Sequence, residues 1–291
     1  MGEKIGLVGL GLVGSALAER FAAAGFSVVG YDIDESRLEA LRDILVEEAG
    51  SPLQVARKAR RIVLSLPDSS IVEEVIEGSN GVVHGSNYDT VIIDTTTGDP
   101  VRTVELAKRL RSRGINYLDA TIVGSSQQVR SGEVILMVGG DEGISNSQRD
   151  VFDTFASEVF WMGANGKGAE TKLVVNLILG LNRLVLAEGL SLGTKAGIDP
   201  ERLLEVLRSS SAYSRVMDVK GDKMITRDFK TQARLRQHLK DVGLIMDMGQ
   251  RIQARLPLSH LHAELLSEAV TAGYGDDDNS AIVNVFLKPP L

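Results

Sequence analysis

The feature that most constrains the fold is a segment near the N-terminus that glycines punctuate. An apolar run over residues 4–8 leads into three glycines in the pattern Gly-x-Gly-x-x-Gly. These are Gly9, Gly11 and Gly14. A helical pattern then ends at Gly25, and a second apolar run over 27–31 is followed by Asp32. This order predicts a strand, a tight turn, a helix and a second strand, which is how a doubly wound, mostly parallel α/β sheet begins.

Each residue of this turn has a predicted physical task. Gly9 makes the turn, Gly11 lets the backbone approach a pyrophosphate, and Gly14 lets helix and strand pack closely. The Asp32 carboxylate would accept hydrogen bonds from ribose hydroxyls and repel a 2′-phosphate. We therefore expect NAD as cofactor, with NADP possible; the alternative is a turn of purely structural use. The residues predicted to bind the cofactor here are Gly9, Leu10, Gly11, Leu12, Val13, Gly14 and Asp32.

Strand and helix patterns alternate as far as residue 162, as a parallel sheet with crossover helices requires. After the first unit the pattern predicts helices over 36–48, 52–59, 71–76, 101–113 and 146–155, and strands over 61–68, 91–95, 115–120, 134–139 and 158–162. Beyond Gly163 only helical patterns follow, over 200–208, 215–224, 234–255 and 258–272 after a first long helix. We predict a dinucleotide-binding Rossmann domain over 1–163 and an all-α substrate and dimerisation domain over 164–291.

The long segment between Gly163 and Gly197 contains no proline and carries apolar residues on nearly every face. This pattern predicts a buried helix that joins the two domains. Lys172 and Asn176 lie four residues apart near its start, so they share one face. A buried lysine is costly without a partner or a function. Because polar residues interrupt the segment, a membrane span is the less favoured interpretation.

Composition narrows the function classes. The chain has 291 residues and a net charge of −7, which is no signature of nucleic-acid binding. It has no cysteine, which excludes disulfides and thiolate chemistry and suits a reducing cytosol. The N-terminus is unlike a signal peptide, so we expect a cytoplasmic protein. The four histidines lack convincing ligand spacing, and we predict no metal site.

Several motifs, in order, make the chain similar to the β-hydroxyacid dehydrogenases, to which 6-phosphogluconate dehydrogenase is a larger relative. The motifs are GLGLVG (9–14), LSLPDSS (64–70), DTTTGDP (94–100), GANGKGAETKLVVN (163–176), KDVGL (240–244) and GYGDDDNSA (273–281). Each motif is weak alone, but together they span nearly the whole chain. The resemblance implies hydride transfer between nicotinamide and the hydroxyl or carbonyl of a small β-hydroxyacid or semialdehyde, in a homodimer or homotetramer.

The resemblance also implies roles for particular residues. Lys172 falls on the catalytic lysine, which exchanges a proton with the substrate oxygen, and Asn176 falls on its partner. That role needs a lysine pKa lowered towards neutrality, by burial and by a cationic neighbour such as Lys240. The remaining cofactor-binding residues that the resemblance implies are Leu66, Pro67, Thr97 and Lys240.

One motif departs from the family pattern. The family's substrate loop DAPVSGG is here DATIVGS over 119–125, so the serine that helps to bind the substrate carboxylate is replaced by Val123. The backbone N–H groups of Gly124 and Ser125 remain candidates for binding an anion. We therefore predict a carboxylate-bearing substrate whose identity stays open. The substrate-binding candidates are Thr121, Val123, Gly124 and Ser125.

Two other functions fit the same architecture. An imine reductase shares it but typically lacks a lysine at this position, so Lys172 disfavours that alternative. A dinucleotide-binding scaffold that has lost catalysis would be expected to lack Lys172 or Asn176, and both are present.

Overall fold

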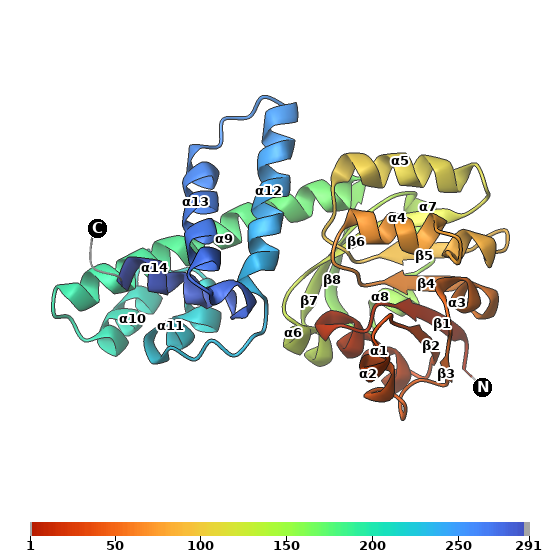
Figure 1. The fold of residues 1–291 in the computed structure, drawn as a ribbon, viewed down its shortest axis with the longest axis horizontal. Helices are drawn as coiled ribbons and strands as arrows, with labels where there is room; N and C mark the ends of the chain where they lie inside the picture. Colours follow the sequence, from red (N-terminus) through yellow and green to blue (C-terminus); the bar gives the residue numbers. More distant parts are fainter. Residues whose placement is uncertain (1, 288–291) are drawn as a thin grey trace. The chain divides into compact units, whose positions relative to one another are not determined.

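The structure is a computed structural model that describes residues 2–287. It divides into two compact units, Met1–Lys172 and Leu173–Leu291. The first unit contains an eight-stranded sheet with the strand order β3-β2-β1-β4-β5-β6-β7-β8 (Figure 1). Its strands are β1 (Lys4–Val8), β2 (Ser27–Tyr31), β3 (Glu47–Glu48), β4 (Arg61–Leu64), β5 (Val91–Asp94), β6 (Asn116–Val123), β7 (Val134–Gly139) and β8 (Ala156–Gly163).

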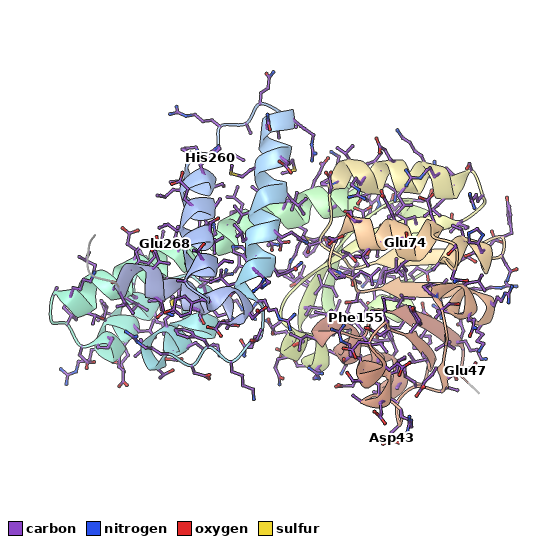
Figure 2. The ribbon with its side chains drawn as sticks, viewed as in Figure 1. Asp43, Glu47, Glu74, Phe155, His260 and Glu268 are labelled. Carbon is purple, nitrogen blue, oxygen red and sulfur yellow. The ribbon has the colours of Figure 1, made fainter. Side chains whose placement is uncertain are left out.

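Neighbouring strands of this sheet are parallel except for β6 and β7, which are antiparallel. Helices cover both faces, because each face carries its own apolar cluster. One cluster includes Leu17, Val129 and Phe155, and Phe155 is labelled in Figure 2. The other includes Val55, Ile76 and Leu110. The helices of this unit are α1 (Leu12–Ala23), α2 (Glu35–Glu39), α3 (Pro52–Lys58), α4 (Ser69–Glu77), α5 (Pro100–Arg111), α6 (Ser126–Ser131), α7 (Glu142–Asn146) and α8 (Arg149–Phe152). The predicted doubly wound α/β domain is therefore confirmed.

Some predicted elements differ from the structure. The helix expected over 36–48 ends at Glu39, and Glu47–Glu48 instead pairs with Val29 and Gly30 as edge strand β3. Of the helix expected over 146–155, the structure has the short helix α8, and a second short helix, α7, ends where the expected helix was to begin. The pattern missed α6, whose six residues are too few for helical periodicity to emerge.

The second unit is helical, with its own apolar cluster that includes Leu186, Leu204, Val242 and Leu266. A long helix, α9 (Lys167–Lys195), contains the point at which the two units divide. The other elements are α10 (Pro200–Ser209), η2 (Met217–Gly221), α11 (Asp222–Thr226), α12 (Leu235–Arg251), α13 (Pro257–Thr271), η3 (Tyr274–Asp276), η4 (Asn279–Ile282) and α14 (Val283–Leu287). The helix expected over 215–224 is a single π-helical turn, η2, followed by α11.

Helix α9 is less covered than its sequence predicts. Val174, Ile178, Val185 and Leu192 are exposed, and the last two keep 68% and 71% of their accessible surface. Their spacing places them along one face of the helix. The prediction that α9 is buried on every side is therefore wrong for this face within one chain. Among the described residues, α9 is also the one helix whose length and apolar composition would suit a membrane span, a test that core helices of soluble proteins pass as well.

Candidate active site

The glycine turn between β1 and α1 has the backbone shape that the pattern predicts. Gly9 has φ +91°, and a Cβ there would lie 2.3 Å from the carbonyl oxygen of Ser65. A Cβ at Gly14 would lie 1.9 Å from the carbonyl oxygen of Gly9. A Cβ at Gly11, the N-cap of α1, would approach nothing nearer than Arg37 Nη1 at 3.8 Å. Space thus remains in front of a helix N-terminus, which fits a cofactor pyrophosphate.

Asp32 follows β2 and is only 6% exposed. Its carboxylate accepts hydrogen bonds from the backbone N–H of Leu10 at 2.6 Å and of Asp34 at 2.9 Å. Arg37 Nη1 donates to the same carboxylate at 3.3 Å. Asp32 therefore braces the glycine turn through the backbone of Leu10, while its contact with the ribose stays a prediction. Arg37, which the sequence did not single out, partly neutralises its charge.

The loops that follow β4 and β5 lie against each other. The backbone N–H of Leu66 donates to Thr96 Oγ1 at 3.2 Å, and Thr95 Oγ1 donates to the carbonyl oxygen of Leu64 at 2.7 Å. Pro67 and Thr97, which are also predicted to bind the cofactor, belong to these same loops. Because the strands are parallel neighbours, their carboxyl ends meet at one edge of the sheet, where ligands bind in doubly wound folds.

The start of α9 is bonded directly to β6. The Asp119 carboxylate accepts hydrogen bonds from the backbone N–H groups of Gly166 at 2.9 Å and Ala169 at 3.0 Å. Burial raises the pKa of Asp119 to about 6, although these two hydrogen bonds favour the charged form. Thr121 Oγ1 donates to the carbonyl oxygen of Gly168 at 3.0 Å. These bonds set the position of the first turns of α9 relative to β6.

Lys172 lies in this attached part of α9. Its ammonium donates to the carbonyl oxygen of Ile122 at 2.6 Å. Ile122 directly precedes Val123, the position at which the substrate loop departs from the family pattern. The structure therefore brings the predicted catalytic lysine together with the predicted substrate loop.

The substrate loop itself is a turn between β6 and α6. Gly124 has φ +149°, and a Cβ there would lie 2.6 Å from Val134 Cγ1, so the position requires glycine. Ser125 is the N-cap of α6, and its backbone N–H donates to Gln128 Oε1 at 2.9 Å. That N–H is thus engaged within a capping box, which the sequence analysis did not foresee. Thr121 is fully buried, and its hydroxyl serves the attachment of α9.

In the second unit, Asn176 and Lys240 converge on one carboxylate. Asn176 Nδ2 donates to Asp241 Oδ2 at 2.9 Å, and Lys240 Nζ lies 3.1 Å from Asp241 Oδ1. Asn176 is 5% and Asp241 7% exposed. Sequence reasoning missed Asp241, although it follows Lys240 within the KDVGL motif. The predicted influence of Lys240 on Lys172 stays a prediction.

Within residues 2–287, no group of three or more histidine, cysteine or carboxylate side chains is arranged to bind a metal ion.

Comparison with known proteins places this arrangement in a family. Residues 4–163 match the family model of the NAD binding domain of 6-phosphogluconate dehydrogenase, and residues 166–286 match that of the NAD-binding region of NADP-dependent 3-hydroxyisobutyrate dehydrogenase. The chain belongs to the β-hydroxyacid dehydrogenase family. It is accordingly an NAD(P)-dependent dehydrogenase or reductase that acts on CH–OH groups.

Individual relatives of this β-hydroxyacid dehydrogenase agree. The 2-hydroxy-3-oxopropionate reductase of Escherichia coli (strain K12) is 32% identical, with 96% of each chain covered. The 2-(hydroxymethyl)glutarate dehydrogenase of Eubacterium barkeri is 31% identical, over 97% of this chain and 94% of its own. The crystal structure of 3-hydroxyisobutyrate dehydrogenase from Salmonella typhimurium superposes with a TM-score of 0.89 at 25% identity, covering 97% of this chain and 99% of that one. These relatives favour a dehydrogenase over the imine reductase and scaffold alternatives.

Proposed function

We propose that this dehydrogenase interconverts a small β-hydroxyacid and its semialdehyde, with Lys172 as the general acid and base. The observation that carries the proposal is the 2.6 Å hydrogen bond between Lys172 Nζ and the carbonyl oxygen of Ile122. It puts a proton-carrying side chain beside the loop expected to bind the substrate. General acid–base catalysis needs the catalytic group within hydrogen-bond reach of the oxygen it serves.

In this mechanism the bound nicotinamide supplies the redox chemistry by accepting or returning a hydride. During oxidation Lys172 takes the proton from the substrate hydroxyl, and during reduction it returns that proton to the carbonyl oxygen. Asn176, one turn further along α9, orients the same oxygen through its amide. Asp241 accepts a hydrogen bond from Asn176 Nδ2, which uses one of the two N–H groups of the amide and none of the acceptor capacity of its carbonyl oxygen.

The substrate loop defines the chemistry of the acid it accepts. Val123 offers methyl groups where the family has a hydroxyl, so a carboxylate gains no hydrogen bond from that side chain. We infer a substrate with an apolar group beside its carboxylate, or one bound through backbone N–H groups such as that of Gly124. Short β-hydroxyacids that differ at the carbon next to the carboxylate are therefore the first substrates to test.

We also propose that the enzyme is a cytoplasmic homodimer or homotetramer that needs neither nucleic acid nor a membrane. The exposed apolar face of α9 supports a partner subunit, since Val185 and Leu192 would otherwise face water. The net charge of −7 supports a protein that does not bind nucleic acid, and the absence of cysteine supports a cytoplasmic location. Light scattering of the purified protein measures its mass, and Val185→Asp should shift it towards the monomer.

The function is tested by incubating purified protein with NAD or NADP and a panel of short β-hydroxyacids, and with NADH or NADPH and the matching semialdehydes. We expect turnover of at least one pair at a rate typical of dehydrogenases. Cofactor binding without turnover across a broad panel would instead favour a scaffold.

A further inference from the structure

A buried tyrosine and a buried aspartate lie next to the two loops, after β4 and β5, that are predicted to bind the cofactor. Tyr117 is on β6, and Asp94 is the last residue of β5. The Tyr117 hydroxyl donates to Asp94 Oδ2 at a distance of 2.5 Å. Both side chains are 5% exposed. Burial is the main cause that raises the pKa of each group. Because the pKa of the Tyr117 hydroxyl is raised further above its ordinary value of 10, this hydroxyl keeps its proton at neutral pH and can donate it.

Asp94 is also hydrogen-bonded to the loop that follows β5. Asp94 Oδ1 accepts a hydrogen bond from the backbone N–H of Thr96 at 2.9 Å. The Thr96 hydroxyl in turn accepts the backbone N–H of Leu66 at 3.2 Å. A continuous chain of hydrogen bonds thus runs from Tyr117 on β6 through the β5 loop to the β4 loop.

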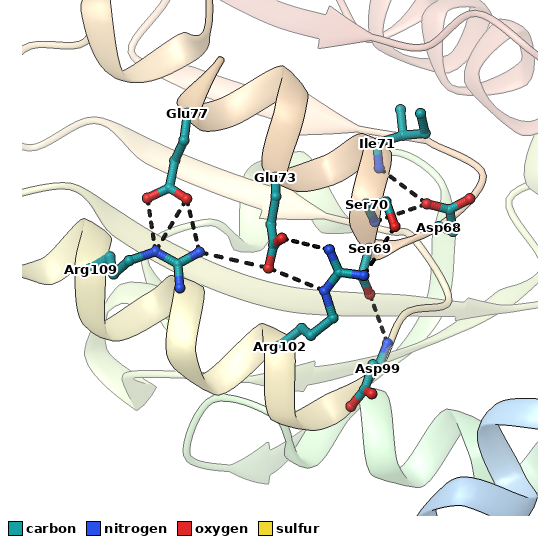
Figure 3. A network of polar contacts seen from close by, with 9 residues as sticks. All are labelled: Asp68, Ser69, Ser70, Ile71, Glu73, Glu77, Asp99, Arg102 and Arg109. Atoms are coloured by element: carbon teal, nitrogen blue, oxygen red, sulfur yellow. Dashed lines mark hydrogen bonds and ion pairs between the residues drawn. The ribbon is translucent and has the colours of Figure 1, made fainter.

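The same two loops are bonded at their far ends. Ser69 Oγ, in the first turn of α4, accepts the backbone N–H of Asp99 at 2.8 Å. Figure 3 shows this bond together with the ion pairs between α4 and α5. In these pairs Arg102 Nη2 lies 2.6 Å from Glu73 Oε2, and Arg109 Nη2 lies 2.8 Å from Glu77 Oε2. Leu66, Pro67 and Thr97 fall between these two sets of bonds, which join the β4 and β5 loops at both ends.

We propose that Tyr117 and Asp94 are a positioning pair that sets Leu66, Pro67 and Thr97 against the nicotinamide half of the cofactor. The pair touches neither cofactor nor substrate and acts through Thr96. The proposal rests on the proposed function: with the adenosine ribose at Asp32 after β2 and the pyrophosphate at the glycine turn after β1, the loops after β4 and β5 lie on the other side of β1, towards the nicotinamide half. Loss of the Tyr117 hydroxyl leaves Asp94 with one partner fewer, so the turn at Thr96 loosens while the glycine turn and Asp32 keep their own contacts.

The test compares NADH with ADP-ribose, which lacks the nicotinamide, by titration calorimetry on the full chain. In Tyr117→Phe we expect the affinity for NADH, divided by the affinity for ADP-ribose, to fall about three- to tenfold. The affinity for ADP-ribose itself should stay as in the parent. Thr96→Val, which removes the acceptor for Leu66, should lower the ratio likewise, and Thr96→Ser, which keeps a hydroxyl, should restore it. Tyr88→Phe is the matched control, because Tyr88 is 78% exposed.

A purely structural role predicts a different pattern. Equal losses of NADH and ADP-ribose affinity, or an unchanged ratio in a Tyr117→Phe protein with its full melting temperature, would overturn the proposal. So would a parent protein that binds NADH no more tightly than ADP-ribose, even if it still turned over a hydroxyacid. A lower ratio in a protein that turns over no substrate in the panel would support the pair while contradicting the proposed reaction.

Discussion

The ammonium of Lys172 donates a hydrogen bond to the carbonyl oxygen of Ile122 at 2.6 Å. The two residues are fifty positions apart in the chain, but Lys172 lies in the second turn of α9 and Ile122 is the last residue but one of β6. Their contact follows from the bonds between Asp119 and the backbone of Gly166 and Ala169, which attach the helix start to the strand.

Lys172 carries the proton in the proposed reaction. Lys172→Ala should lower kcat by about 10²- to 10⁴-fold, the usual contribution of a general acid or base. Lys172→Arg should lose nearly as much, because a guanidinium donates hydrogen bonds but stays protonated. Initial rates at saturating cofactor measure both. Lys195→Ala, at the other end of α9, is the control, and full activity in Lys172→Arg would rule out the proposed proton transfer.

Val123 occupies the position of the family serine. Val123→Ser should raise kcat/KM for 3-hydroxyisobutyrate about tenfold, because a hydroxyl can donate to the substrate carboxylate, and such charged hydrogen bonds are among the stronger ones. Steady-state kinetics on that acid measure the effect. Val123→Ala removes the methyl groups without adding a hydroxyl. An equal gain in Val123→Ala would show that space, and not the hydroxyl, limits this substrate.

Asp241 accepts Asn176 Nδ2 and pairs with Lys240. Asp241→Asn keeps the size of the side chain but weakens both contacts, so kcat/KM should fall about tenfold. Kinetics with varied cofactor should show part of the loss in the cofactor KM, through Lys240. Asp247→Asn, on the exposed side of the same helix, is the matched control. Unaltered kinetics in Asp241→Asn would show that Asp241 contributes neither to catalysis nor to cofactor binding.

Asp32 should set the choice between NAD and NADP. Asp32→Asn retains an acceptor for the backbone but removes the charge that repels a 2′-phosphate, and it releases Arg37 from its pairing. The ratio of kcat/KM with NAD to that with NADP should fall about tenfold, in line with the size of a near-surface charge interaction. Asp34→Asn serves for comparison, since Asp34 also pairs with Arg37 but is more exposed. An unchanged ratio would mean that another group selects the cofactor.

His262 makes the stability depend on pH. Burial, and then the nearby positive charge of Arg183, lower the pKa of His262 from 6.5 to about 4. In the unfolded chain the His262 imidazole therefore binds a proton below pH 6.5, whereas in the folded chain it binds that proton only near pH 4. Stability that is present above pH 6.5 is lost as the pH falls towards 4, by about 2 kcal/mol between pH 7.5 and 5.

Urea unfolding at pH 7.5 and 5 measures this loss. His262→Gln should have a flatter pH dependence than the parent, because glutamine does not titrate. His260→Gln is the control, because His260 lies on the exposed side of α13 (Figure 2). The assignment fails if His262→Gln and the parent lose the same stability on acidification.

Much of the fold was predictable because it depends on local patterns. The glycine turn after β1 requires backbone shapes that only glycine adopts easily, and Gly9 does have a positive φ. Buried strands such as β4 and β5 can be predicted because they are short apolar runs in the sequence. The helical pattern was wrong for residues 40–48, because Glu47 and Glu48 become strand β3 only by pairing with β2. Such pairing is a tertiary event, and it overrides local propensity.

The sequence by itself determined the residue types, their order along the chain and the family to which they belong, and so the type of chemistry. The tertiary structure alone decided which groups meet. The register of β6 beside β5 aligns Tyr117 with Ile92 and Asp119 with Asp94, so the Tyr117 hydroxyl can reach Asp94, and the start of α9 on β6 gives Lys172 its contact with Ile122. It also decided that one apolar face of α9 stays uncovered within the chain. Periodicity shows that a face is apolar, but only packing shows what covers it.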